Sequence, residues 1–424
     1  MLICKMYFLL LIFCTTTFAY SEGNVKYAAI IFRHGDRTPV DLYPNDPYKN
    51  ESYWPVKFGE LTNNGKRQHF NFGKWLRQRY SHLLSKDFDP AEIYIQSTDV
   101  DRTLMSAQAN LAGLYPPSGK TIWNSDVMWQ PIPVHTIPKN EDEVLSMEKP
   151  CSAYDRELEN FTNSKAFIEG LSKYKKLMDY LTIHSGKKVK TYYDIESIYN
   201  TLYVESLYNF TLPNWTDAVY PNKMRKPACH SFTTDTGTPL LARLKVGPLL
   251  KSITNNMMSA ITSDSGKHFK VHMYSAHDLT VGSILNGLGL FDGKCPCYTS
   301  AVFFELLSDT TGTSHYVKIS YRNTTGIGEP YVLEIPDCGK ICPINMFMKI
   351  YDNLISVDWE RECTKEFTPR LAVAFLAGIC VVVSIYIAHK IHFIRVYKNN
   401  RKVRGYANIM RAELQVTQLK TYDV

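Results

Sequence analysis

Five consecutive apolar residues, Ala28–Phe32, lead directly into the charged loop 33–39, which reads Arg-His-Gly-Asp-Arg-Thr-Pro. An uninterrupted apolar run of this length is typical of a buried strand. Gly35 and Pro39 favour a turn immediately after that strand. In an open α/β sheet, ligands bind at the carboxyl ends of the strands. The loop 33–39 is therefore the first candidate for a functional site.

The residue types in this loop favour phosphate. Arg33 and Arg37 each carry a guanidinium group, whose planar fork of donors matches phosphate oxygens. His34 stands between them and can attack the phosphorus atom that they hold. A charged surface turn is the simpler interpretation, but the position directly after a buried strand argues against it. We therefore expect phosphoryl transfer through a histidine.

Alternating strand and helix patterns predict the fold class. Such alternation indicates an α/β domain whose central, mostly parallel sheet is flanked by helices. Apolar runs predict strands at 27–32, 93–97, 270–275, 302–307, 315–321 and 331–335, and helical patterns occupy 62–84, 102–114 and 279–288. Residues from about 141 to 235 lack the strand rhythm, so we expect a smaller, mainly helical insertion into a core of 20–140 and 236–370.

Two further segments, Ser97–Arg102 and Tyr274–Asp278, also follow a predicted strand and open a predicted helix. Arg102 would oppose the positive end of its helix dipole unless an anion bound there. A structural role is the alternative for both segments, because the residues before Arg102 and Asp278 itself can serve as N-caps. If the three strand ends converge, His277 can hold a phosphate oxygen and Asp278 can act as a general acid.

The expected reaction uses all three strand ends. His34 attacks the phosphorus and forms a phosphohistidine. The phosphate oxygens are held by Arg33, Arg37, Arg102 and His277. Asp278 protonates the departing oxygen and later takes a proton from water. Because a carboxylic acid with an ordinary pKa of about 4 donates best below neutral pH, we expect an acidic optimum.

Two apolar segments indicate the secretory pathway. Residues 1–19 have one charge, Lys5, and an apolar centre, and they predict a signal peptide cleaved before Tyr20; an uncleaved anchor is the alternative. Residues 371–388 contain no charge and are long enough to cross a bilayer. A buried core helix is the alternative, but no strand or helix pattern follows for it to pack against. The tail 389–424 has eight Lys or Arg against two Asp or Glu, which predicts a cytoplasmic position. The region between the segments is close to neutral, which argues against nucleic-acid binding.

Sequons and cysteines fit this topology. Five Asn-x-Ser/Thr sequons precede the second apolar segment, at Asn50, Asn160, Asn209, Asn214 and Asn323. Seven cysteines lie between the two segments, where an oxidising compartment favours disulfides and an odd number leaves one thiol over. Cys338 and Cys342 are close enough in sequence to close a small loop. A zinc site on these residues and on Cys295-Pro-Cys297 is a weaker alternative, because the latter spacing is too short for a usual zinc pair.

The motifs match a known family. Arg-His-Gly-x-Arg-x-Pro at 33–39 and the later His277-Asp278, together with the segments 97–106 and 129–135, resemble the histidine acid phosphatases of the prostatic and lysosomal type. The resemblance covers nearly all of the region before the second apolar segment. It implies a two-domain α/β phosphatase that cleaves phosphate monoesters without a metal or other cofactor, commonly as a homodimer.

The resemblance also implies individual roles. It assigns the nucleophile to His34, proton donation to Asp278, and phosphate binding to Arg33, Arg37, Arg102 and His277. It further implies the disulfides Cys151–Cys363, Cys229–Cys297 and Cys338–Cys342, with Cys295 left over. The His-Asp pair argues against a phytase-like relative, which more often has His-Ala-Glu.

Two other function classes compete with this interpretation. A metal-dependent phosphohydrolase could use His34, His277 and Asp278, but the ligands of such enzymes usually lie on helices. A catalytically silent surface receptor on the same scaffold would not need all six site residues. Neither a P-loop nor a Cys-x5-Arg loop is present in the sequence.

The predicted span favours a single-pass type I membrane protein of the lysosomal type. The tail segment Tyr406–Ile409 is similar to a tyrosine-based sorting signal, but it lies further from the span than lysosomal signals usually do. Lysosomal membrane and cell surface therefore both remain open as locations.

Overall fold

The computed structural model describes residues 24–263, 268–326, 328–364 and 367–419. The chain divides into two units, the first ending at Cys363 and the second beginning at Thr364. The signal peptide expected at residues 1–19 lies outside the described residues. The first unit contains a sheet and every residue of the expected site, and the second unit is helical.

A single mixed sheet forms the centre of the first unit. Its strands are β1 (Asn24–Arg33), β2 (Ile93–Thr98), β3 (His135–Ile137), β4 (Val271–Ala276), β5 (Ala301–Ser308), β6 (His315–Arg322), β7 (Tyr331–Val332) and β8 (Cys342–Pro343). They are arranged in the order β3-β2-β4-β1-β5-β6-β7, and β8 also pairs with β6. The first four are parallel to one another, whereas β5 to β8 are added antiparallel. The α/β prediction is confirmed, with a parallel half that carries the expected site.

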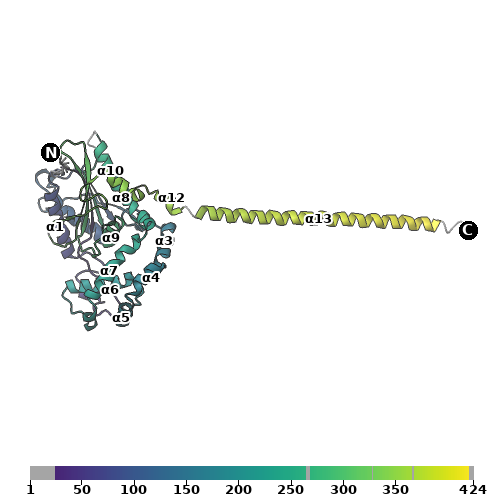
Figure 1. Ribbon diagram of the computed structural model, residues 1–424, viewed down its shortest axis with the longest axis horizontal. Coiled ribbons are helices and arrows are strands. Elements are labelled where there is room, and N and C mark those ends of the chain that lie inside the picture. Colours follow the sequence, from purple (N-terminus) through teal and green to yellow (C-terminus); the bar gives the residue numbers. More distant parts are fainter. Residues whose placement is uncertain (1–23, 264–267, 327, 365–366, 420–424) are drawn as a thin grey trace, which may run out of the picture. The chain divides into compact units, whose positions relative to one another are not determined.

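Helices cover both faces of this sheet. The helices before α13 are α1 (Asn63–Arg79), α2 (Asp101–Leu114), α3 (Ser152–Thr162), α4 (Lys165–Ser172), α5 (Lys175–Ser185), α6 (Tyr192–Leu207), α7 (Asn222–His230), α8 (Pro239–Thr262), α9 (Asp278–Gly287), α10 (Ile344–Ile350), α11 (Asp352–Ile355) and α12 (Trp359–Thr364). Figure 1 shows α1 on one side of the sheet and α8 and α10 on the other. Short 3₁₀ helices include η4 (Asn214–Ala218) and η5 (Ser231–Thr236).

The position of β1 within the sheet explains the uninterrupted apolar run Ala28–Phe32. Tyr27, Ala29 and Ile31 pack into the cluster beneath α8, α9 and α10, whereas Ile30 and Phe32 pack into the cluster beneath α1 and α2. Both faces of the strand are therefore removed from water, and each apolar side chain stabilises one of the two layers.

Residues 141–235 are mainly helical, as predicted. Helices α3 to α7 supply this region, and α4 to α7 gather beyond one end of the sheet (Figure 1). These helices build a cluster of their own from fully buried residues that include Leu181, Ile195, Ile198, Leu202 and Met224. The insertion therefore has an apolar core that is separate from the two layers beside the sheet.

The sheet order brings the three expected strand ends together. β4 lies between β2 and β1, and all three run in the same direction. Ser275 of β4 is paired with Ser97 of β2 on one side and with Phe32 of β1 on the other. The loops that follow these strands consequently leave the same edge of the sheet side by side.

The disulfides differ from the expectation at one pair. Cys151–Cys363 and Cys338–Cys342 are present, but Cys229 is bonded to Cys295. The expected pair Cys229–Cys297 is therefore wrong, and Cys297 keeps a free thiol. The backbone explains this choice, because the N–H of Cys295 lies 2.9 Å from Cys229 Sγ, while the N–H of Cys297 donates to Asn323 Oδ1 (2.7 Å). Cysteines engaged in disulfides are not available as zinc ligands.

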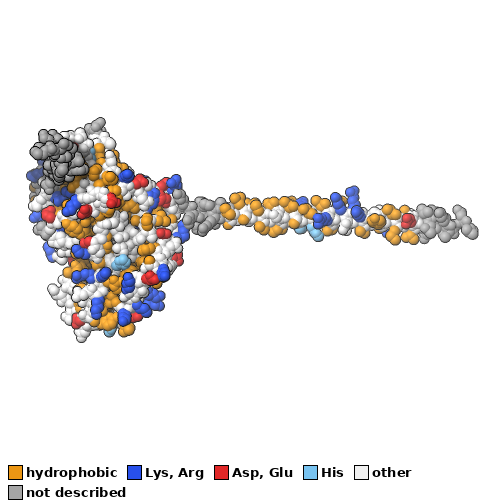
Figure 2. Space-filling view, viewed as in Figure 1, with side chains coloured by type: hydrophobic (Ala, Val, Ile, Leu, Met, Phe, Trp, Pro, Cys, Tyr) orange, Lys and Arg blue, Asp and Glu red, His pale blue; other side chains and the backbone are white. Residues whose placement is uncertain are grey.

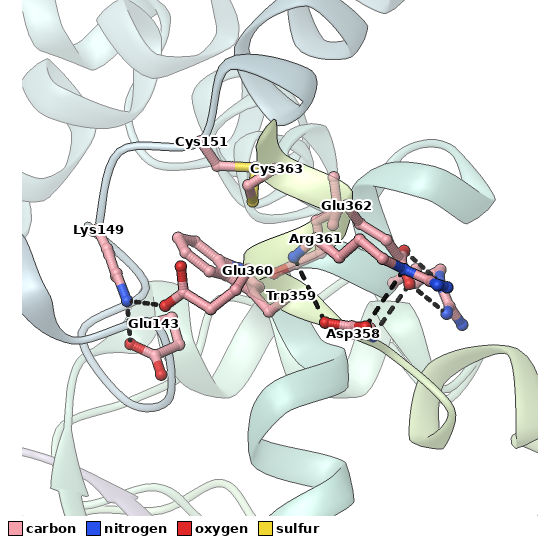
Figure 3. The surroundings of a disulfide bond; sticks show 11 residues. Glu143, Lys149, Cys151, Asp358, Trp359, Glu360, Arg361, Glu362 and Cys363 are labelled. Carbon is pink, nitrogen blue, oxygen red and sulfur yellow. Dashed lines mark hydrogen bonds and ion pairs between the residues drawn. A yellow bond between two sulfur atoms is a disulfide. The ribbon is translucent and has the colours of Figure 1, made fainter. Parts of the chain in front are cut away.

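The disulfide Cys151–Cys363 anchors the end of the first unit. It joins the loop before α3 to α12, beside the indole of Trp359 (Figure 3). Trp359 donates a hydrogen bond to the carbonyl of Leu244 in α8 (3.1 Å). Lys149 adds ion pairs to Glu143 (3.5 Å) and to Glu360 of α12 (Figure 3). The last residues of this unit are thus held by covalent, polar and aromatic contacts.

The second unit is the long helix α13 (Phe367–Leu419). Its segment Val373–Gln415 is long and apolar enough to cross a membrane, judged by length and composition. Apolar side chains cover its first part, and the basic side chains follow in the later part (Figure 2). The basic residues after the apolar part include Lys390, Arg395, Lys398, Arg401, Lys402 and Arg404. This order matches the predicted span at 371–388 with a basic segment after it.

Candidate active site

Neighbouring strands fix the backbone of His34. Its N–H donates to the carbonyl of Ala276 at the end of β4 (3.0 Å), and its carbonyl accepts from the N–H of Thr299 (3.2 Å). Thr299 has a φ of 59°, which is rare for a β-branched residue. Such strain persists only where the surroundings impose it, and it is common at functional sites. His34 itself is only 1% exposed.

The turn after His34 requires two glycines in contact. A Cβ atom on Gly35 would lie 2.5 Å from the carbonyl oxygen of Gly65, and one on Gly65 would lie 2.3 Å from the carbonyl oxygen of Asp36. Gly65 is in the first turn of α1, where its N–H is accepted by the N-cap residue Thr62 (3.1 Å). The start of α1 is therefore pressed against the loop that carries His34.

Hydrogen bonding decides which nitrogen of His34 is free. Nδ1 lies 2.8 Å from the carbonyl oxygen of Gly35, so it must carry the proton and donate. Nε2 then keeps its lone pair and is available as a nucleophile. Burial, followed by the positive charges of Arg33 and Arg102, lowers the pKa of His34 well below its usual value. The surroundings therefore favour the neutral imidazole, which is the form that a nucleophilic nitrogen requires.

Arg33 is buried and oriented on three sides. Its Nη2 lies 2.7 Å from Oδ2 of Asp278, and its Nη1 donates to the carbonyl of Pro296 (2.6 Å). Its guanidinium also lies 4.4 Å from the ring centre of Tyr298. These contacts hold the guanidinium in one orientation before any ligand is present.

Arg37 and Arg102 complete a group of three guanidinium groups. Arg37 donates to the side chain of Asn200 in α6 (3.0 Å), and Arg102 extends from the first turn of α2. Burial, and next the charge of Arg37, lowers the pKa of Arg102 to about 10. The Nε atoms of Arg33, Arg37 and Arg102 are buried without a hydrogen-bond partner within the described part of the chain. Crowded cations with unused donors form a site for an anion.

A chain of hydroxyl groups sets the tautomer of His277. Nδ1 lies 3.4 Å from Nη2 of Arg102, which can only donate, so Nδ1 accepts. Nε2 therefore carries the proton and donates to Thr98 Oγ1 (3.0 Å), which in turn lies 2.8 Å from Thr103 Oγ1. Burial and Arg102 lower the pKa of His277 to about 3, so the ring is neutral in the free protein.

Asp278 begins α9 and faces the guanidinium groups. Burial alone would raise its pKa, but Arg33 and Arg37 outweigh burial and hold this pKa below its usual range. The N-cap position belongs to His277, and Asp278 accepts only from the N–H of Leu279 (2.9 Å) among backbone groups. Capping therefore does not explain Asp278. The same holds for the segment before Arg102, because the N-cap of α2 is Val100, which has no side-chain bond to the helix.

Two cavities open on either side of Asp278. One, of about 460 Å³, is lined by residues that include Arg37, Arg102, Asp278, Glu196 and Asn200. The other, of about 490 Å³, is lined by Arg33, Glu196, Asn200, Tyr203 and Asp278 with the segment 293–297. A larger cavity of about 600 Å³ lies beside Asn24 at the opposite end of β1 and contains none of the expected site residues.

The structure brings all six expected site residues together at the strand ends. They are Arg33, His34, Arg37, Arg102, His277 and Asp278. Reasoning from the sequence missed Glu196 and Asn200, which α6 contributes from the helical insertion, and Tyr298, which lies beneath Arg33. No motif surrounds these three residues, because only the tertiary structure places them at the strand ends.

The chain is similar to known phosphatases over most of its length. Residues 24–238 and 237–322 match the model of the histidine phosphatase superfamily (branch 2). The chain is 37% identical over 384 residues to the lysosomal acid phosphatase of Xenopus laevis, covering 88% of each chain. It is 40% identical over 362 residues to the prostatic acid phosphatase of Homo sapiens, covering 84% of this chain and 92% of that protein. The Hafnia alvei phytase solved with tartrate has the same fold, with a TM-score of 0.61 at 19% identity over 81% of this chain and 99% of that one.

Proposed function

The chain belongs to the histidine phosphatase superfamily (branch 2) and is an acid phosphatase, and we propose that it hydrolyses phosphate monoesters through a phosphohistidine on His34. The single observation that carries this mechanism is the hydrogen bond from His34 Nδ1 to the carbonyl of Gly35. Because Nδ1 carries the proton, Nε2 keeps a free lone pair beside the guanidinium groups.

The phosphate is bound by Arg33, Arg37 and Arg102. Their buried, unpartnered Nε atoms and their mutual repulsion make the empty site unfavourable, and an anion removes both costs. The same donors stabilise the charge that spreads over the phosphoryl oxygens in the transition state. The guanidinium groups are already oriented by their protein contacts, so little reorganisation is needed at the moment of reaction.

The first chemical step forms a bond between Nε2 of His34 and phosphorus. As this bond forms, the bond between phosphorus and the ester oxygen breaks, and its electron pair leaves with the oxygen. Asp278 gives a proton to that oxygen. For this, a bound phosphate must compete with Asp278 for Arg33, which weakens the 2.7 Å ion pair and favours the protonated carboxyl.

The second step returns the enzyme to its starting state. Water gives a proton to Asp278 and attacks the phosphorus, and the electron pair of the broken N–P bond returns to Nε2 of His34. The carbonyl of Gly35 keeps the imidazole in one orientation and tautomer through both steps.

Acidic conditions suit the phosphate contact of His277. Its Nδ1 accepts in the free protein, so a ligand oxygen beside it needs a proton of its own. A phosphate monoester carries that proton below its second pKa of about 6. The monoanion is therefore the form that we expect to bind best, and we infer that His277 accepts from its P–OH group.

Trapping the intermediate tests the mechanism. The full chain, purified in detergent, is mixed with a ³²P-labelled monoester at pH 5 and quenched in alkali, which preserves an N–P bond. Label recovered on residue 34, and absent from His34→Ala, supports the proposal. Hydrolysis at the full rate without label on residue 34, or activity that EDTA abolishes, would contradict it.

We also propose that the catalytic unit faces the exoplasmic side of a lysosomal or cell-surface membrane. The apolar part of α13, followed by basic residues, supports a single-pass anchor with a cytoplasmic tail at 389–424. Four sequon asparagines, Asn50, Asn160, Asn209 and Asn214, are exposed and open to glycosylation. Asn323 is half-buried, and its amide is bonded to the backbone of Cys295 and Cys297, so glycosylation there would compete with these bonds.

We further propose a homodimer through the edge of the sheet. β3 is the last strand of the described sheet, and all three of its residues are exposed. The segment before it exposes apolar side chains that include Trp123 (59%), Met128 (67%) and Trp129 (39%). An unpaired strand edge beside an apolar strip is suited to pairing with a second copy. Analytical ultracentrifugation of the full chain in detergent, compared with Trp123→Glu, tests this association.

A further inference from the structure

Glu196 is a carboxyl group in the crevice that the proposed mechanism does not use. It projects from α6 of the helical insertion and lines both of the cavities beside Asp278. Glu196 and Asp278, together with Asn200 and Phe232, line both cavities. The crevice therefore presents a pair of carboxyl groups, one from the insertion and one from α9, to any leaving group that extends from the bound phosphate.

The charges around this pair separate the two acids. Glu196 is under the influence of Asp278 in α9, of Arg37 and Arg33 in the strand-end loop, and of Lys187 before α6. Burial, and next the negative charge of Asp278, raises the pKa of Glu196 to about 7 despite the three cations. Arg33 and Arg37 hold the pKa of Asp278 low. Two carboxyl groups whose environments push their acidities apart can divide the tasks of holding and accepting a proton.

We infer that Glu196 and Asp278 act as a pair that holds one proton, which rests on Glu196 in the free enzyme and passes to Asp278 when phosphate binds. This inference rests on the proposed function and adds a positioning residue for its proton-transfer step. The bound phosphate draws Arg33 away from Asp278, so Asp278 becomes the better site for the proton. The leaving oxygen then takes the proton from Asp278, and the proton released by water in the second step restores the pair. No proton is gained or lost over the cycle.

The test compares Glu196→Gln with Glu196→Asp, so that the carboxyl is either replaced by an amide of equal size or kept on a shorter side chain. Glycerol 2-phosphate has a leaving group that needs a proton, whereas p-nitrophenyl phosphate has one that hardly needs it. Glu169→Gln serves as a matched control, because it makes the same change at an exposed carboxyl group of α4 that lines neither cavity. All four proteins are assayed as the full chain from pH 4 to pH 8.

We expect Glu196→Gln to lose at least tenfold in kcat/KM for glycerol 2-phosphate at pH 6, and much less at pH 4, where Asp278 can take its proton from solution. The basic limb of its pH profile should move to lower pH by about one unit. The loss with p-nitrophenyl phosphate should be several-fold smaller. Glu196→Asp should recover much of the wild-type profile, and Glu169→Gln should reproduce it.

An unchanged pH profile in Glu196→Gln would overturn the inference. So would an equal loss on both substrates at every pH, because that is the signature of a structural defect. Trapping of ³²P on His34 in the same preparations separates this outcome from failure of the proposed function. A wild-type enzyme that never carries label contradicts the phosphohistidine, whereas labelled enzymes with identical pH profiles contradict only the role of Glu196.

Discussion

Arg33 Nη2 and Asp278 Oδ2 lie 2.7 Å apart, so the loop that carries the proposed nucleophile and the helix that carries the proposed acid are joined by an ion pair in the free enzyme. The side chain of Arg33 is 4% exposed and that of Asp278 is 19% exposed. A partly buried pair of this kind is costly to leave half-made, so a substrate phosphate that engages Arg33 also changes the protonation of Asp278. Binding and proton transfer are therefore coupled through one contact.

The first prediction concerns the acid. Asp278→Asn cannot give a proton to the leaving oxygen, so it should lower kcat for alkyl phosphates by about 100-fold or more and for p-nitrophenyl phosphate far less. Steady-state kinetics with a series of esters of increasing leaving-group pKa measures this difference. Asp99→Asn, which changes an exposed acid at the neighbouring strand end, should behave like the wild type. Equal slowing across the whole series would remove Asp278 from the acid role.

The second prediction concerns the two glycines that touch beside the site. Gly65→Ala places a methyl group where the carbonyl oxygen of Asp36 lies, so the loop 33–39 must shift. We expect a loss of about 2–4 kcal/mol in the free energy of unfolding and a fall in kcat of at least tenfold. Chemical denaturation and kinetics measure the two effects. Gly170→Ala is the control, because in helix α4 the new methyl meets only ordinary contacts and should be neutral or slightly stabilising.

The third prediction concerns the cysteines. Peptide mapping of non-reduced protein should find Cys229 linked to Cys295, and Cys297 should be alkylated once the protein is unfolded. Cys297 is half-buried, and burial raises the pKa of its thiol. Alkylation of the folded enzyme should therefore be slow. Cys297→Ser should keep its activity and its three disulfides. A Cys229–Cys297 peptide as the main product would show that the other pairing is the native one.

The fourth prediction concerns stability against pH. Glu205 in α6 is fully buried beside Asp46, and burial, followed by the charge of Asp46, raises the pKa of Glu205 to about 9. A group whose pKa is raised by folding stabilises the protein at low pH, and this contribution falls as pH rises toward the folded-state value. The melting temperature and the free energy of unfolding should therefore both decrease from pH 5 to pH 8. One such group lowers the free energy of unfolding by up to about 1.4 kcal/mol per pH unit.

Glu205→Gln checks this assignment, because an amide of the same size does not titrate. Its melting temperature should depend less on pH over the same interval than that of the wild type. If the two proteins lose stability in parallel between pH 5 and pH 8, a group other than Glu205 causes the loss of stability with rising pH. Glu205 and Asp46 join α6 to the loop after the catalytic turn, so this pair links the insertion to the core most firmly in acid.

Local patterns in the sequence were sufficient to predict the parallel half of the sheet. β1, β2 and β4 are rich in apolar residues and lead into polar and charged residues, so both their existence and their functional edge could be inferred. β7 is shorter than the predicted strand at 331–335, because Tyr331 and Val332 are the described residues that form ladder pairs with β6, and the pairing ends after the N–H of Leu333 donates to Ile319. Helix α8 was not predicted, since it is buried on most sides and contains Pro248, so it lacks the one-sided apolar pattern of a surface helix.

Only those site residues that stand in local sequence motifs could be predicted. The six residues at the strand ends stand in recognisable motifs, whereas Glu196 and Asn200 reach the crevice from a helix more than 150 positions after His34. Their side chains have no local signature, because their role depends on how the insertion packs against the core. The sequence also does not show whether Cys295 or Cys297 is bonded to Cys229, because the two cysteines are only two positions apart. In the structure Cys295 forms the disulfide, and the backbone N–H of Cys297 is bonded to Asn323 instead.

Cys363 is the last residue of the first unit, and its bond to Cys151 ties the chain back on itself just before the membrane-type helix begins. A peptidase that cuts beyond residue 363 would shed the whole phosphatase in one piece, with every cross-link retained. A cut between 152 and 362 would leave the nicked halves joined through sulfur. The same polypeptide can therefore exist with or without helix α13, according to where it is clipped.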